Sequence, residues 1–140
     1  MPAEKTIRLE IDSLAYGPYG VGRERERVIL VPFTAPGDEI EARIVAEKKN
    51  YATADLIRVL KPSADRRPAP CPYLPRCGGC PWQHVNYARQ LAAKENIVLE
   101  NLRRIGRFEN FRLLPIVPSP DQYHYRRRIR LQCSADKTLG

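Results

Sequence analysis

Three cysteines in one short segment are the most chemically specific feature of this 140-residue sequence. Cys71, Cys77 and Cys80 stand in CPYLPRCGGCPWQH, with five residues between the first two and two glycines between the last two. Gly78 and Gly79 let the backbone fold tightly enough for Cys77 and Cys80 to face one centre, and leave amide N–H groups that can point at sulfur. Nothing in the sequence indicates an oxidising compartment, so a disulfide scaffold is disfavoured. The pattern predicts thiolates that converge on a metal.

The spacing alone leaves the metal open. Structural zinc usually has paired C-x2-C knuckles, or one knuckle followed by two spaced histidines, and His84 and His124 lack that spacing. Three clustered cysteines plus a remote one suit an iron–sulfur cluster better, with zinc and plain reduced thiols as alternatives. Cys133 is the fourth ligand by counting, but it also suits a small buried side chain in an expected strand. His84 suits a hydrogen-bonding role better than ligation.

Two sets of basic residues are candidate RNA contacts. The densest run is Arg126, Arg127, Arg128 and Arg130, whose guanidinium groups can bind phosphate in bidentate fashion. We expect this run to contact RNA, against the alternative of a solvated surface. The second set is Lys48, Lys49 and Tyr51, which combines charge with an aromatic face that can stack on a base. Tyr16, Tyr19 and Phe33 suit stacking and barrel packing equally well.

The net charge of +8 is unevenly distributed. Residues 1–60 carry nine Lys and Arg against ten Asp and Glu, whereas residues 61–140 carry fifteen against six. A polyanion, RNA or DNA before an acidic protein or a membrane face, is therefore the expected partner, and the positive excess lies in the second part. No eighteen apolar residues run together, and the start MPAEKTIRLE lacks the apolar region of a signal peptide. We expect a monomeric cytoplasmic protein with no membrane partner.

Residues 1–62 are predicted to form a small all-β barrel of the OB-like kind. Ile7, Leu9 and Ile11 alternate with polar residues, and further strands are expected at 27–31, 39–47 and 51–60. The glycines of AYGPYGVG indicate tight turns, and Pro36-Gly37-Asp38 indicates another. About five strands in so short a segment favour closure into a barrel, which removes exposed edges. A plain β-sandwich fragment is the alternative.

Residues 63–140 are predicted to form an incomplete α+β domain. Six of the thirteen prolines lie between 62 and 81, so that stretch is expected to be loop. A helix is expected at about 86–105, capped by Asn86 and ended by Gly106 in a left-handed conformation, with its apolar stripe packed in a core. A basic strand is expected at about 125–133. One helix and one strand cannot bury their apolar faces alone, so the unit looks unfinished.

Several segments together resemble one family, the bacterial RNA uracil-5-methyltransferases, close to the 23S ribosomal RNA enzymes. The matching segments are YGPYGVG, VPFTAPGDEIEARI, KKNYATADL, CPYLPRCGGCPWQH with the following Gln90-Leu91 and Lys94, and YRRRIR. The resemblance implies an N-terminal TRAM barrel, a central [4Fe–4S] domain and a C-terminal S-adenosyl-L-methionine (SAM) domain. It also implies that Cys71, Cys77 and Cys80 are cluster ligands, that Cys133 is not one, and that the fourth ligand lies beyond residue 140.

The same resemblance places the catalytic chemistry outside these residues. The family adds a cysteine thiolate to uracil C6, transfers methyl from SAM to C5, and removes the C5 proton with a base. The sequence has no glycine-rich SAM loop and no catalytic-cysteine segment, so no catalytic residue is expected before position 140. The expected function is therefore an RNA-binding, cluster-binding N-terminal portion that is inactive alone. The alternatives are a stand-alone zinc-containing RNA-binding module and, last, a radical-SAM RNA methylthiotransferase, whose cysteine spacing differs.

Overall fold

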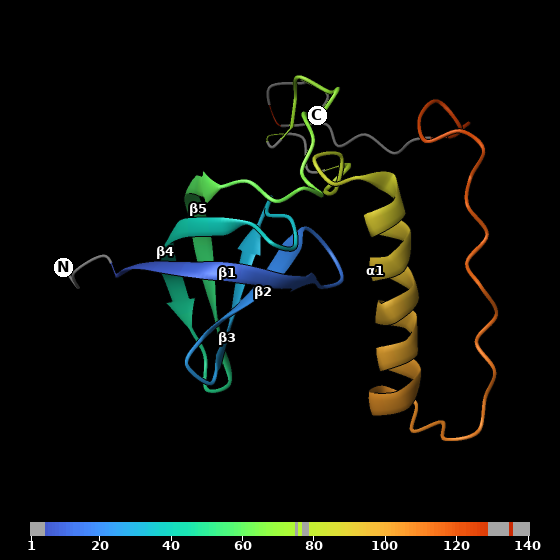
Figure 1. The fold of residues 1–140 in the computed structure, drawn as a ribbon, viewed down its shortest axis with the longest axis horizontal. Helices are drawn as coiled ribbons and strands as arrows, with labels where there is room; N and C mark the ends of the chain where they lie inside the picture. Colours follow the sequence, from blue (N-terminus) through green and yellow to red (C-terminus); the bar gives the residue numbers. More distant parts are fainter. Residues whose placement is uncertain (1–4, 75, 77–78, 129–134, 136–140) are drawn as a thin grey trace.

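The computed structural model describes residues 5–74, 76, 79–128 and 135, which form a β-barrel, a loop segment, one helix and a long coil (Figure 1). The barrel strands are β1 (Thr6–Leu14), β2 (Tyr19–Glu24), β3 (Arg27–Pro32), β4 (Glu39–Glu47) and β5 (Tyr51–Lys61). The helix α1 (Tyr87–Glu100) continues into a π-helical turn, η1 (Asn101–Ile105). Among these residues, no helix is long and apolar enough to cross a membrane.

The five strands close into a barrel in the order β1-β2-β3-β5-β4, as the sequence predicts. Neighbouring strands pair antiparallel except β3 and β5, which run parallel. Alternate residues of β1 point inward, because side chains of a strand alternate between its two faces. The core they enter is built from nine buried residues: Ile7, Leu9, Ile11, Ile29, Val31, Ile40, Ala42, Ala52 and Ala54. Closure leaves no unpaired strand edge in this small sheet.

The sequence analysis interprets all of residues 15–22 as turns, which is wrong for residues 19–22, because they belong to strand β2. Only Gly17, with φ +90°, has a turn conformation that disfavours other residues. Gly20 and Gly22 lie inside β2, paired with Val31 and Ile29 of β3. A Cβ on Gly22 would contact the Leu9 side chain and lie 2.6 Å from the Glu10 carbonyl oxygen. These glycines therefore serve close packing between strands.

The predicted helix is present, but its two ends differ from expectation. Asn86 occupies the N-cap position without a side-chain cap; its Nδ2 instead donates to Ala64 O at 3.1 Å. Gly106 is right-handed, with φ −73°, and Arg107 takes the positive φ of 54°. The helical run ends at Ile105 as predicted, but the left-handed residue is Arg107, one residue later than predicted.

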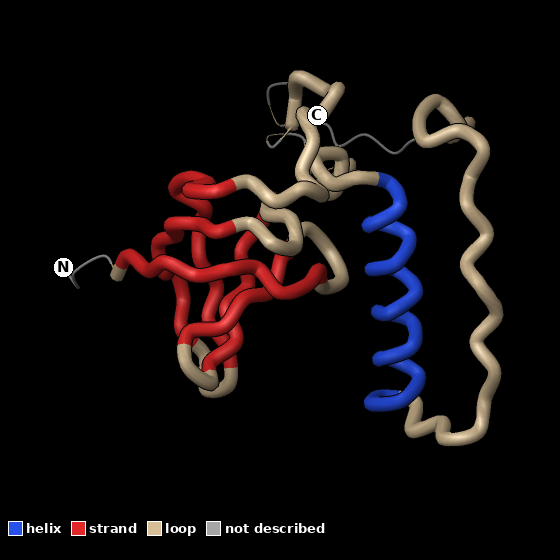
Figure 2. The backbone as a smooth tube through the Cα atoms, in the orientation of Figure 1, coloured by secondary structure: helices blue, strands red, loops and turns tan. Residues whose placement is uncertain are grey.

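The expected core packing of the helix stripe is wrong within this structure. No residue of α1 or η1 is buried, and Val98 and Ile105 are 47% and 79% exposed. Ala93 alone packs, with Trp82, against the small cluster of Leu14, Ala35 and Val85 at the barrel. The helix stands beside the barrel (Figure 2), and its packing contact, Ala93, lies midway along α1.

Beyond the helix, residues 106–128 form a coil that returns alongside α1 (Figure 1). The strand predicted at about 125–133 is absent from 125–128, the part of it that the structure describes. These residues lack a neighbouring strand in the described chain, and an extended segment needs a partner to form a ladder. Residues 129–133, which include Arg130 and Cys133, lie outside the described residues.

Candidate nucleic-acid interface and cysteine loop

The proline-rich segment is fastened to the barrel by a buried carboxylate that the sequence analysis missed. Asp38 is fully buried after the turn before β4, and its oxygens accept from the N–H groups of Ala35 (2.6 Å) and Ser63 (2.9 Å). Arg66 donates to the same carboxylate from Nε (3.0 and 3.1 Å) and Nη2 (2.6 Å), and to Phe33 O at 2.9 Å. Burial opposes ionisation of Asp38, but these hydrogen bonds outweigh it and hold its pKa below its usual value.

His84 makes a second contact between the same segment and the barrel. Its ring is buried, and Nε2 lies 3.1 Å from Thr34 O. Burial lowers the pKa of His84, so the ring is neutral near pH 7 and Nε2 carries the proton that Thr34 O accepts. This agrees with the hydrogen-bonding role expected from the sequence. Nδ1 keeps its lone pair and has no hydrogen-bond partner among the described residues.

The cysteine loop, residues 71–84, follows Ser63 and Arg66 in the chain. Cys71, partly buried, and Cys80, exposed, are both free thiols; Cys77 lies outside the described residues. Three ligands of one metal are not found together among the residues that the structure does describe, a search that excludes Cys77. The buried indole Nε1 of Trp82, two residues after Cys80, lacks an acceptor there. A thiolate or sulfide is an acceptor of that kind, so the loop fits a sulfur-liganded group.

One end of the barrel holds the second set of predicted RNA contacts, Lys48, Lys49 and Tyr51. Lys48 and Lys49 are exposed in the β4–β5 turn, and Tyr51, 39% exposed, opens β5. Because β3 and β5 run parallel, with Val28 opposite Tyr51, the β2–β3 turn lies at the same end and adds Arg25. Arg25 was missed because its position depends on strand pairing. Neither this arginine nor the two lysines form an ion pair within the described chain.

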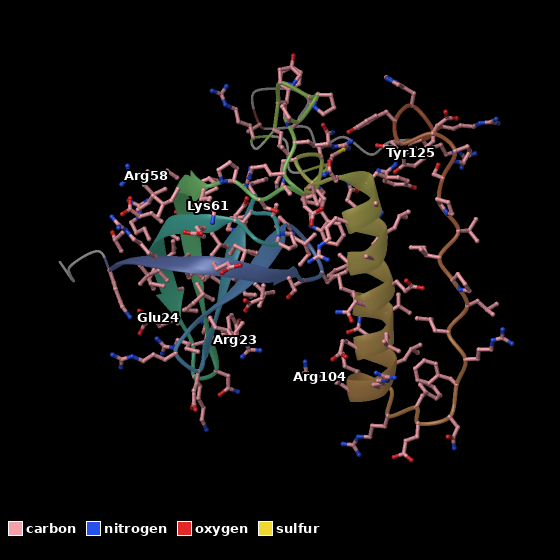
Figure 3. The ribbon with its side chains drawn as sticks, in the orientation of Figure 1. Arg23, Glu24, Arg58, Lys61, Arg104 and Tyr125 are labelled. Carbon is pink, nitrogen blue, oxygen red and sulfur yellow. The ribbon has the colours of Figure 1, made fainter. Side chains whose placement is uncertain are left out.

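The other basic residues of the barrel are largely neutralised. Arg8 and Arg58 both bind Glu41, at 3.4 and 2.8 Å, and Lys61 binds Glu39 at 2.9 Å. Arg58 and Lys61 project near one end of β5, while Arg23 and Glu24 lie toward the other end of the barrel (Figure 3). The hydrogen bond from Arg58 is the main cause that lowers the pKa of Glu41, and the bond to Glu39 raises the pKa of Lys61. The barrel end with Lys48 and Lys49 is therefore its freest source of positive charge.

The first set is the arginine run, of which the structure describes Arg126, Arg127 and Arg128; these three are exposed in the coil. It follows Tyr125, which lies near the N-terminal end of α1, whereas Arg104 lies near the C-terminal end (Figure 3). The structure does not bring this run together with the lysines of the β4–β5 turn, which lies at the far end of the barrel (Figure 1). The chain thus offers two separate cationic patches.

Comparisons with known proteins agree with this architecture. Residues 7–64 match the family model of the TRAM domain of tRNA (uracil(54)-C(5))-methyltransferase, which covers the barrel β1–β5. A protein of Aquifex aeolicus named "Uncharacterized RNA methyltransferase" is 39% identical over 134 residues, which are 96% of this chain and 32% of that protein. A similarly named protein of Synechocystis is 41% identical over 94% of this chain and 28% of its own length. The chain spans about a third of the length of these relatives.

A solved structure is also similar to this chain. The crystal structure of Pyrococcus abyssi tRNA (uracil-54, C5)-methyltransferase in complex with S-adenosyl-L-homocysteine aligns with a TM-score of 0.60 and 33% identity, over 94% of this chain and 28% of that one. The TRAM-type barrel expected from the sequence is therefore confirmed. The two bacterial relatives are named RNA methyltransferases, which agrees with the family expected from the sequence; their names give no substrate.

Proposed function

We propose that this chain is the N-terminal RNA-binding and [4Fe–4S]-binding region of a SAM-dependent RNA uracil-C5 methyltransferase. The observation that carries the proposal is the similarity to proteins named RNA methyltransferases over 94% and 96% of the chain. That similarity extends past the barrel into the cysteine loop and the helix. In this proposal residues 1–62 are the RNA-binding barrel and residues 63–140 begin the cluster domain.

The proposed cluster ligands are Cys71, Cys77 and Cys80, with a fourth from polypeptide beyond residue 140 and not Cys133. The free thiols of Cys71 and Cys80 and the unpaired indole N–H of Trp82 support this assignment. When bound, the cluster supplies iron centres that cross-link the loop. Methyl transfer needs no redox step, so the proposed role of the loop is to hold the RNA-binding elements in place.

The residues of this chain bind and orient the substrate. Lys48, Lys49 and the run at 126–128 neutralise phosphates, and Tyr51 stacks on an unpaired base. The bond-making steps at uracil C6 and C5, and the binding of SAM, belong to the part of the relatives that this chain does not span. The sequence motifs support 23S ribosomal RNA as the substrate, in a monomeric cytoplasmic enzyme. The solved relative is named for transfer RNA, which is the competing substrate.

A zinc-containing RNA-binding module is the second candidate, and one observation favours it. The Nδ1 lone pair of His84 is buried and unpaired in the described chain, while Nε2 donates to a backbone carbonyl. Metal-bound histidines commonly have this arrangement, so a Cys₃His zinc site is chemically reasonable. The cysteine spacing favours the cluster.

RNA titrations test the RNA-binding half of the proposal. The chain, prepared without oxygen, is titrated by fluorescence anisotropy with a 23S ribosomal RNA fragment, a transfer RNA and single-stranded DNA of the ribosomal sequence. We expect tighter binding to the ribosomal fragment and a plot of log K against log salt with a slope of about −3 to −4, from five phosphate contacts. The chain alone should transfer no methyl group from labelled SAM. Equal binding to DNA, or methyl transfer by the chain itself, would contradict the proposal.

A further inference from the structure

Arg67 joins two segments that lie far apart in the sequence. Its backbone N–H donates to His84 O at 2.9 Å, and its Nε donates to Gln83 O at 3.1 Å. The other side of the same guanidinium group reaches the coil: Nη1 donates to Gln122 Oε1 at 3.3 Å and Nη2 to Tyr123 OH at 2.8 Å. The guanidinium carbon also lies 5.9 Å from the centre of the Tyr123 ring. One half-buried side chain therefore bridges the cysteine-loop segment and the coil.

The loop side of this bridge is itself well anchored. The Oε1 of Gln83 accepts from the N–H of Cys71 at 3.2 Å, and Arg66 forms a β-bridge with Val85. Through Arg66 and Asp38 the same segment is fixed to the barrel. These contacts hold the backbone around Arg67 in a fixed position relative to the barrel.

The coil side has few other attachments. Residues 106–128 contain no helix or strand, and Ser119 N–H, which donates to Tyr87 OH at 2.8 Å, is another tether of the coil among the described residues. Tyr123 lies three residues before Arg126. A flexible segment that becomes ordered on binding loses conformational entropy, so a tether at this point favours any ligand that binds the arginine run.

We propose that Arg67 is a positioning residue: it holds the coil against the cysteine loop so that Arg126, Arg127 and Arg128 meet RNA phosphates together. This inference rests on the proposed RNA-binding function. The role requires the planar fork of an arginine, because one group must donate simultaneously to Gln83 on one side and to Tyr123 on the other. A lysine keeps the positive charge but cannot make both sets of bonds.

A double-mutant cycle tests the proposal in the full chain. The probe is a fluorescein-labelled single-stranded RNA longer than the roughly 4–16 nucleotides that one OB fold covers. Arg67→Lys and Tyr123→Phe should each weaken RNA binding by about 3- to 10-fold, the effect of one or two lost hydrogen bonds. The triple variant R126A/R127A/R128A should reduce the salt slope by about 2. Adding Arg67→Lys to that triple variant should change the affinity no further.

Matched controls separate this role from others. Arg89→Lys, at an arginine paired with Asp65 at 3.3 Å, should bind RNA like the wild type. Thermal melts show whether each variant is folded; Tyr123→Phe removes a single oxygen and keeps the test informative if Arg67→Lys unfolds. If Arg67→Lys weakens binding equally in the triple background, or has no effect in the wild type, the inference is wrong. If the triple variant binds like the wild type, the proposed RNA contact itself fails.

Discussion

Replacement of Asp38 by Asn should loosen the junction between the barrel and the cysteine loop. Asp38 is fully buried and accepts from Ala35, Ser63 and Arg66. Asn keeps one acceptor oxygen and turns an N–H₂ group toward donors, so at least one buried N–H and the charged hydrogen bonds of Arg66 are lost. Breaking a buried ion pair costs about 3–5 kcal/mol; Arg66 is 21% exposed and can partly rehydrate, so we expect about 2–4 kcal/mol.

Urea denaturation at pH 7 measures this loss directly, and the melting temperature should fall by roughly 10 °C. Hydrogen exchange should speed up first at the N–H groups of Ser63 and Arg67. Asp12→Asn is the matched control: its carboxylate is half exposed and 3.9 Å from Arg23, so its loss should cost less than about 0.5 kcal/mol. If Asp38→Asn is as stable as this control, the buried Asp38–Arg66 pair is not the main interaction that holds the loop segment to the barrel.

The pH dependence of the same variant has a defined sign. The pKa of Asp38 is lower in the folded than in the unfolded protein, so the carboxylate contributes stability above its unfolded pKa of about 3.9. That contribution declines as the pH falls below this value and is lost as the pH passes through the folded pKa. The stability difference between wild type and Asp38→Asn should therefore be constant from pH 7 to 5 and shrink below pH 4. A difference that grows toward pH 3 would contradict this explanation.

Two further predictions concern the barrel. Gly22→Ala should destabilise the protein by about 1–3 kcal/mol in urea denaturation, because its Cβ meets Leu9 and the backbone of Glu10; a neutral effect would mean that β2 does not pack as described. Lys48→Ala with Lys49→Ala should reduce the salt slope of RNA binding by about 1.4, and Tyr51→Ala should cost about 1–3 kcal/mol of affinity with the slope unchanged. An unchanged affinity in both the double-lysine variant and Tyr51→Ala would exclude this end of the barrel as a contact.

The parts of the fold that the sequence predicts are those encoded by local patterns. Ile7, Leu9 and Ile11 alternate in β1 because every second side chain enters the core. Strand β2 escapes the same reasoning, since Gly20 and Gly22 carry no hydrophobic side chains to form a pattern. Glycine is needed at these two positions because Leu9 and other residues across the barrel lie too close to leave room for a Cβ atom.

The candidate site was predicted less completely, for a related reason. Pro36-Gly37-Asp38 was correctly interpreted as a turn, yet the burial of Asp38 depends on Arg66, 28 residues later. Arg67 likewise acts through Tyr123, 56 residues away. Pairings over such distances leave no periodic signal in one sequence. The arginine run at 126–128 was recognised from its charge, but its predicted strand lacked a partner strand in the described chain.

The metal content of the chain, isolated without oxygen, tests the central claim most directly. With a small external thiol added to take the place of the fourth ligand, we predict about four iron atoms and equivalent sulfide per chain, with visible absorption, in the wild type, in Cys133→Ser and in His84→Gln, and their loss in Cys80→Ser. Iron absent from the wild type, with one zinc ion that both Cys80→Ser and His84→Gln release, would contradict the cluster and establish the Cys₃His alternative.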